Sequence, residues 1–268
     1  MKKTMRFLII CFALVFMYAP ILILSVYSFL DTANIGASGN FTLDNYITLF
    51  TTPELSEMIW GTVILALVSA VISTFLGTIG AIGTYYSRRR TQAFVNAVNQ
   101  VPVVNADVVT GFSICILLVI LFGMSKETFF PLVAGHVTMC TPFVYLSVLP
   151  KLKQMDQSVY EAALDLGSSP AHALTSVVVP QLAGGIISGF MLAVTLSLDD
   201  YFIATYTKPA TFDTISTYVV NATRGSHTEI KTALWALSTV IFVLVILIVA
   251  GMNIAANKED KNERRQNA

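Results

Sequence analysis

Three carboxylates interrupt long stretches that otherwise carry no charged side chain: Asp107, Asp199 and Asp200. An ionised group at such depth in an apolar layer costs about 2.5 to 3.5 kcal/mol, and it usually faces a partner or a watery path. No Lys or Arg lies in the same stretches to neutralise the three charges. A cationic ligand with ammonium groups on an apolar stem would supply the counter-charge, and the aromatic ring of Tyr201 would favour it further. These four residues are therefore candidates for a cation path.

Distance along the chain separates the candidates. Asp107 lies only a few residues into its stretch, whereas Asp199 lies about 24 Å along a helix from Ala183 at 1.5 Å per residue. We expect Asp107 and Asp199 to occupy different sites, as successive stations or as one station and one structural group such as a helix cap. Neighbours on a helix diverge by about 100°, so at most one of Asp199 and Asp200 should face the path well. The other would pair with a basic group of a companion chain, and packing or gating is the alternative for both.

Membrane-spanning helices are expected to carry these residues. Of the 268 residues 55% are hydrophobic and 12% charged, with 16 basic and 16 acidic side chains. A soluble domain is about a quarter charged, so an ordinary cytosolic enzyme is excluded. The zero net charge also argues against nucleic-acid binding. Stretches of about 20 apolar residues are long enough to cross a hydrocarbon layer. We predict one all-α membrane domain with six transmembrane helices at about 7–30, 58–86, 101–122, 129–150, 182–206 and 232–252.

The basic residues predict the orientation of these helices. The two ends of the chain and the stretches 87–100 and 151–181 carry twelve of the 16 Lys and Arg residues. Because positive loops stay in the cytoplasm, both termini are expected on the cytoplasmic side of a bacterial inner membrane. The apolar core of 7–30 exceeds the about 7 to 15 residues of a cleaved signal peptide, so we interpret this segment as a retained anchor. His136, a lone histidine in the fourth predicted span, is interpreted as a hydrogen-bonded core residue rather than a ligand.

The stretch 156–180 predicts two short helices joined by a sharp turn. In the first helix, Glu161 and Asp165 share one face, and the opposite face is apolar, made of Val159, Ala162, Ala163 and Leu166. The paired alanines make that face shallow, so another helix can approach it closely. The face suits a partner that moves, or lipid headgroups on which the loop rests.

Local signals mark the ends of these two helices. Gly167 suits the left-handed position that follows a helix C-terminus. Ser169 and Pro170 form an N-cap and first-turn pair, so a second helix should start at once. Pro180 marks where that helix ends or bends into the next span. The expected product is a compact helical hairpin at the membrane surface.

This stretch resembles the EAA loop of ABC importer permeases. Glu161, Ala162 and Ala163, followed after three residues by Gly167 and after nine more by Val177, Val179 and Pro180, match the family's spacing at every position, with valines in place of isoleucine and leucine. The resemblance covers nearly the whole chain and is closest to spermidine/putrescine permeases, especially their C subunits. The other stretches that carry it are Ala19 to Ile21, Ser28 and Phe29, Asp107 to Val109, Thr141 to Val144 and Thr195 to Asp200.

The resemblance implies a type I (MetI-like) importer fold and a set of partners. These are a second permease subunit, two cytosolic ATPases, an extracytoplasmic binding protein and the lipid bilayer. It also implies that Glu161, Ala162, Ala163, Gly167 and Pro180 couple the permease to the ATPase, and that the cargo is a polyamine. The sequence has no G-x-x-x-x-G-K-[ST] motif, so ATP and Mg²⁺ are expected on the separate ATPase chain, with no cofactor on this one. A permease for an anion or metal chelate and a secondary transporter are the alternatives.

Overall fold

The computed structural model describes residues 3–32, 36–224 and 231–266. Within these ranges the regular structure is helical, apart from an isolated antiparallel bridge between Leu30 and Phe41. The predicted all-α fold class is confirmed. In chain order the helices are α1 (Lys3–Tyr27), α2 (Asp44–Thr51), α3 (Pro53–Tyr85), α4 (Arg89–Val104), α5 (Asp107–Cys115), η1 (Ile116–Leu121), α6 (Phe130–Gln154), α7 (Gln157–Asp165), α8 (Pro170–Ala173), η2 (Leu174–Val178), α9 (Val179–Gln181), α10 (Ala183–Asp199), α11 (Phe202–Thr207), α12 (Ile215–Arg224) and α13 (Lys231–Gln266).

The membrane-crossing helices fall into two kinds. Four helical segments are long and apolar enough to cross a bilayer alone: Ile9–Tyr27, Pro53–Tyr85, Phe130–Gln154 and Thr232–Gly251. Two further candidates are bent pairs, α4 with α5 and η1 at 105°, and α8 to α9 with α10 at 70°. Counting each bent pair as one span gives six among the described residues.

The chain forms two compact units. One unit contains residues 1–58 and 218–249. Within it the Asn45 amide donates to the carbonyls of Ser28 and Leu30 at 2.9 and 2.8 Å, which satisfies the backbone where α1 ends. The rings of Tyr27 and Trp235 meet edge to face at 5.7 Å, joining α1 to α13.

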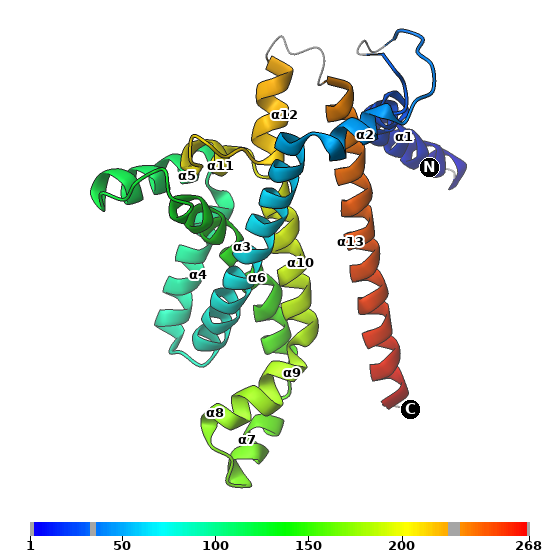
Figure 1. Cartoon of the computed structure of the whole chain (residues 1–268). Helices are drawn as coiled ribbons and strands as arrows, with labels where there is room; N and C mark the ends of the chain where they lie inside the picture. The colour runs from blue at the N-terminus through cyan, green and yellow to red at the C-terminus, as the bar shows by residue number, and fades with distance from the viewer. Residues whose placement is uncertain (1–2, 33–35, 225–230, 267–268) are drawn as a thin grey trace. The chain divides into compact units, whose positions relative to one another are not determined.

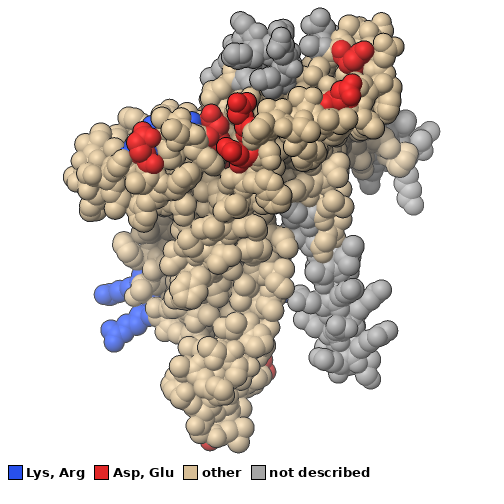
Figure 2. Space-filling model, in the orientation of Figure 1, with Lys and Arg blue, Asp and Glu red and all other residues tan. Residues whose placement is uncertain are grey.

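The other unit contains residues 59–217 and 250–268 and holds every candidate site residue. Its centre is α6, which packs against α4, α5, α10 and α11. In Figure 1, α4, α6 and α10 run side by side, with α5 and α11 across one end and α7 and α8 at the other. Figure 2 shows acidic side chains gathered at the end with α5 and α11, and basic side chains projecting beside the α3–α4 connection.

The predicted third span, 101–122, is not one helix. The chain runs helically from Arg89 to Val104, then bends by 105° into α5 at Asp107. The polar residues that made 89–100 look like a loop are bonded to α6. Asn96 accepts a hydrogen bond from the Tyr145 hydroxyl at 2.7 Å, and the Asn99 amide donates to the Pro142 carbonyl at 3.4 Å. Counting uncharged residues misses this helix, because its polar groups are satisfied by a neighbour.

The predicted fifth span, 182–206, is also divided. The helix α10 ends at Asp199, Asp200 has an extended backbone, and α11 begins at Phe202. Before α10, the short helices from Pro170 to Gln181 meet it at 70°, so the uncharged stretch 166–198 contains more than one helix. The carboxylates therefore lie at a corner of the chain rather than along a straight helix.

Candidate functional site

One cavity brings the sequence-predicted path residues together. It has a volume of about 280 Å³ and is lined by Asp107, Met139, Thr195, Leu196, Asp199, Asp200, Tyr201 and Phe202. All four candidate path residues are in this set, and they come from α5 and from the α10–α11 corner. The expectation that Asp107 and Asp199 occupy different sites is therefore wrong. It assumed that the segment containing Asp107 starts at the membrane surface, but α4 precedes Asp107 and carries it to the level of Asp199.

The two neighbouring aspartates at the corner have different surroundings. Asp199 is exposed, whereas Asp200 is 7% exposed. The Asp200 carboxylate accepts the backbone N–H of Ile203 at 3.2 Å and that of Ala204 at 2.8 Å. Its Oδ2 atom also lies 3.6 Å from Nε2 of His136 on α6. Asp199 is thus the more open of the two carboxylates. The side chain beside Asp200 is a histidine of this same chain, and not a basic group of a companion chain as the sequence analysis expected.

His136 is a core residue, as the sequence analysis expected. Its side chain is fully buried, and its Nδ1 atom shares a hydrogen bond of 2.8 Å with the Ser197 hydroxyl on α10. The connection between His136 and Asp200 was missed by sequence reasoning. The two residues are far apart in sequence, and no local pattern joins them. The only available signal was that a buried carboxylate needs a nearby donor, and His136 is a titratable residue in an adjacent predicted span.

Aromatic rings complete the rim of the acidic cavity. Tyr201 is half-buried, and its ring meets that of Phe202 edge to face at 5.2 Å. Rings beside carboxylates can hold the methylene stem of a cation while the carboxylates hold its charged ends. No group of three or more His, Cys, Asp or Glu side chains within the described ranges is arranged to hold a metal ion. The cavity therefore combines carboxylates and aromatic rings on one rim.

The loop 156–180 has the helix ends that its sequence signals predict. Asp156 caps α7 by accepting the Ser158 N–H at 3.0 Å, and this bond holds the pKa of the Asp156 carboxyl below its usual value. Gly167 has φ of +88°. The N–H groups of Gly167 and Ser168 donate to the carbonyls of Leu164 and Ala163 at 2.9 and 3.1 Å, a Schellman ending that requires the left-handed glycine.

The second helix of the loop also starts and bends where expected. Ser169 caps α8 by accepting the His172 N–H at 3.3 Å, with Pro170 as its first residue. Pro180 lies in α9, just before the 70° bend into α10. Tyr160 packs on Tyr86 with ring centroids 5.4 Å apart, which joins α7 to the end of α3.

The predicted apolar face of α7 is uncovered. The Leu166 side chain is 89% exposed and that of Val159 is 43% exposed, while Glu161 and Ala162 are exposed and Ala163 is half-buried. Burying a leucine is worth about 1.5 to 3 kcal/mol, so covering this apolar face would be favourable.

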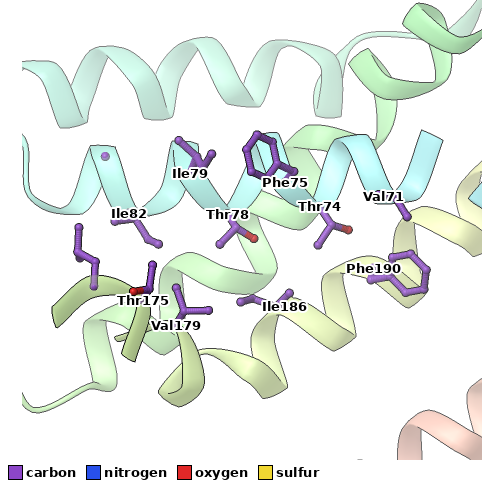
Figure 3. Close-up of a pocket in the computed structure, with 12 residues that line it drawn as sticks. Val71, Thr74, Phe75, Thr78, Ile79, Ile82, Thr175, Val179, Ile186 and Phe190 are labelled. Carbon is purple, nitrogen blue, oxygen red and sulfur yellow. The ribbon is translucent and has the colours of Figure 1, made fainter. Parts of the chain in front are cut away.

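A larger groove of about 730 Å³ lies between α3 and the segment from η2 to α10. Figure 3 shows Thr74 and Thr78 of α3 pointing toward Ile186 and Phe190 of α10 across it. Its lining carries no charged side chain. Burying a charged group without a partner is costly, so this groove is less suited to a cation than the smaller acidic cavity is.

Comparison with known proteins identifies the family. Residues 73–258 match the model of the family described as binding-protein-dependent transport system inner membrane component. The chain is 29% identical over 250 residues to the spermidine/putrescine transport system permease protein PotC of Escherichia coli strain K12, covering 92% of each chain. It is 30% identical over 253 residues to the putrescine transport system permease protein PotI of the same strain, covering 92% of this chain and 89% of that protein.

Solved structures support the same fold. A bacterial ABC transporter involved in import of the acidic polysaccharide alginate has a chain with TM-score 0.72 and 18% identity, covering 95% of this chain and 94% of that one. The MetNI methionine ABC transporter has one with TM-score 0.62 and 14% identity, covering 76% and 95%. At these identities the likeness shows the fold alone. With the family match over most of its length, the chain belongs to the inner membrane components of binding-protein-dependent transport systems, the permease subunits of ABC importers.

Proposed function

We propose that this permease moves polyamines such as spermidine and putrescine into the cytoplasm. The observation that carries the proposal is the single cavity in which Asp107, Asp199 and Tyr201 meet. Two exposed carboxylates beside aromatic rings match ammonium groups spaced along an apolar stem. The permeases named for spermidine and putrescine that resemble this chain over nine-tenths of its length add to that support.

The size of the cavity suits one end of such a ligand. Its volume of about 280 Å³ is slightly below the range of about 300 to 1,000 Å³ typical of pockets that enclose a whole ligand. We infer that a companion permease subunit provides the rest of the site. The path would then run between two permeases, each contributing acidic and aromatic groups. An anionic cargo, the alternative, would meet only repulsion from Asp107 and Asp199.

The proposed orientation follows from the charges at the two ends of the unit. Arg88, Arg89 and Arg90 lie at the α3–α4 connection, and Lys151 and Lys153 lie in the last turns of α6, which leads into α7. Positive-inside placement puts this end and both termini in the cytoplasm of a bacterial inner membrane. The acidic cavity then faces the outer half, where an extracytoplasmic binding protein would deliver cargo.

The proposed mechanism is alternating access driven from the hairpin. Two cytosolic ATPase chains would bind and hydrolyse ATP with Mg²⁺, and the 156–180 projection would receive their motion through the uncovered face of α7. Glu161, Ala162 and Ala163 lie on that helix, Gly167 fixes the turn, and Pro180 lies at the bend into α10. Because α10 ends at Asp199, a tilt of the hairpin and α10 would move one wall of the cation site. A few kcal/mol of differential binding is enough to shift such a two-state equilibrium.

Uptake by vesicles that contain the complete complex tests the cargo. We expect labelled spermidine or putrescine, and not sulfate, to accumulate, and we expect Asp199→Asn to raise KM at least about tenfold, a loss of about 1.4 kcal/mol of binding. Glu57→Gln, which removes an exposed carboxylate outside the cavity, is the matched control and should leave KM unchanged. Unchanged polyamine uptake by Asp199→Asn would refute the cation path. Uptake by the permease without any ATPase would favour a secondary transporter.

A further inference from the structure

A buried chain of three side chains stands directly behind the cation site. The Ser197 hydroxyl and Nδ1 of His136 are 2.8 Å apart, and Nε2 of His136 faces Oδ2 of Asp200 at 3.6 Å. Ser197 is 2% exposed, His136 is fully buried and the Asp200 side chain is 3% exposed. When the Ser197 hydroxyl donates to Nδ1, the neutral imidazole carries its proton on Nε2. Among the described residues Nε2 has no hydrogen-bond partner, and Oδ2 of Asp200 lies just beyond hydrogen-bond distance from it.

Asp200 is held by protein groups on several sides. Its two oxygens accept the N–H groups of Ile203 and Ala204 in the first turn of α11, and His136 approaches from α6. A buried carboxylate is tolerated when donors surround it, and removing one donor leaves an uncompensated charge. The Asp200 carboxylate therefore fixes the corner at which α10 ends and α11 begins.

The corner that Asp200 fixes is also the wall of the cation site. Asp199 and Tyr201 are the residues on either side of it, and both line the cavity. A displacement of the peptide at residue 200 would move both side chains together. Binding groups must be held within about 0.5 Å and 10 to 20° of their working geometry, so a support that relaxes lowers affinity before it unfolds the protein.

We propose that His136 is a positioning residue for the polyamine site: acting through Asp200, it holds Asp199 and Tyr201 in the geometry that binds cargo. This inference rests on the proposed function, and it gives the two adjacent aspartates different roles. Asp199 contacts the ligand, and Asp200 supports the wall. It also assigns a role in transport to a histidine that does not itself line the cavity.

The test compares two substitutions of His136 in the assembled complex. His136→Gln keeps an N–H donor near Asp200, and His136→Leu removes the donor while preserving an apolar side chain. We expect His136→Leu to raise KM for putrescine about tenfold with the maximal rate within about twofold, and His136→Gln to stay within about threefold of wild type. If His136 only filled space, its replacement by leucine would not raise KM while leaving the maximal rate nearly unchanged.

A double-mutant cycle with Asp200→Asn tests whether the effect passes through the carboxylate. In the Asp200→Asn background, His136→Leu should change KM by less than about twofold, because the supported charge is already gone. A full additional effect in that background would overturn the proposal, as would an unchanged or lower KM for His136→Leu alone.

A substrate-free readout separates this inference from the proposed function. The four proteins of the cycle are wild type, His136→Leu, Asp200→Asn and the double variant. Thermal unfolding of the purified complexes detects coupling between positions 136 and 200 whatever the cargo is. If the two substitutions were coupled in their effect on thermal stability but not in their effect on KM, His136 and Asp200 would form a structural contact only. That result would overturn the positioning role. The proposed cargo is judged independently, by Asp199→Asn.

Discussion

The Cα atom of Ile203 on α11 lies 2.9 Å from the point where a Cβ atom on Gly111 of α5 would stand. The two helices therefore meet through their backbones. The Cγ2 atom of Ile203 also lies 2.6 Å from where a Cβ on Gly135 of α6 would stand. Ile203 is fully buried, so three helices close on one side chain next to the acidic cavity.

Gly111→Ala is expected to destabilise this junction. Its methyl group would meet backbone of α11, which cannot rotate away, and overpacking of this kind costs about 1 to 3 kcal/mol. Gly83→Ala in α3 is the matched control, because a Cβ there meets no atom within 4 Å. Thermal unfolding of the purified complex should show a lower midpoint for Gly111→Ala and an unchanged midpoint for Gly83→Ala. Equal midpoints for the two variants would mean that α5 and α11 do not pack this closely.

The local structure of the hairpin could be predicted from sequence because its signals are local. A glycine after an amphipathic helix, followed by a serine and a proline, specifies a left-handed ending and a new N-terminus within four residues. The structure has the expected φ at Gly167 and the expected cap at Ser169. Which partner covers the exposed face of α7 is not written in those residues, and that role stays a proposal.

The cavity could be predicted only in its parts, because its assembly depends on contacts between distant segments. The sequence singled out the carboxylates because they lack counter-charges, and Tyr201 because an aromatic ring favours a cation. It separated Asp107 from Asp199 because the third span was predicted to begin at residue 101. The helix α4 already begins at Arg89, and its Asn96 and Asn99 are bonded to α6. The bend between Val104 and Asp107 likewise has no strong local signal. Counting uncharged residues gives the length of a segment along the chain. A bend of 105° changes how deep its residues lie in the membrane, but it does not change that length.

Gly167→Val is expected to reduce transport while leaving the protein in the membrane. A Cβ at Gly167 meets no atom within 4 Å, so the substitution adds backbone strain without a clash. Left-handed backbone costs an L-residue about 1 to 2 kcal/mol, enough to reopen the Schellman turn between α7 and α8. Polyamine uptake per permease in the membrane measures the effect.

Gly36→Val is the control for that strain. Gly36 has φ of +95° and equally open surroundings, but it lies outside the hairpin. Its variant should transport normally at equal membrane levels. If both variants lost uptake to the same extent, general backbone strain rather than the hairpin turn would explain the defect.

Leu166→Ser is expected to weaken ATPase coupling without destabilising the permease. An 89% exposed side chain contributes little to folding, and surface substitutions usually change stability by less than about 0.5 kcal/mol. If Leu166 docks on the ATPase, co-purification of that subunit and uptake should fall about tenfold. Asp165→Asn, on the opposite face of α7, should keep both near wild type. Normal co-purification for Leu166→Ser would place the docking surface elsewhere.

The combination of Asp107→Asn with Asp199→Asn distinguishes one cation site from two successive stations. Substitutions more than about 7 to 10 Å apart without shared partners add in free energy, whereas residues that share a ligand couple by about 0.5 to 3 kcal/mol. Both carboxylates line the same cavity, so we expect the double variant to raise KM less than the product of the two single effects. Once one carboxylate is lost, an ammonium group held between them gains less from the other. KM for putrescine and spermidine, measured in vesicles at equal permease content, gives the coupling directly. If the fold-increases in KM of the two single variants simply multiplied in the double variant, Asp107 and Asp199 would act at separate positions on the path.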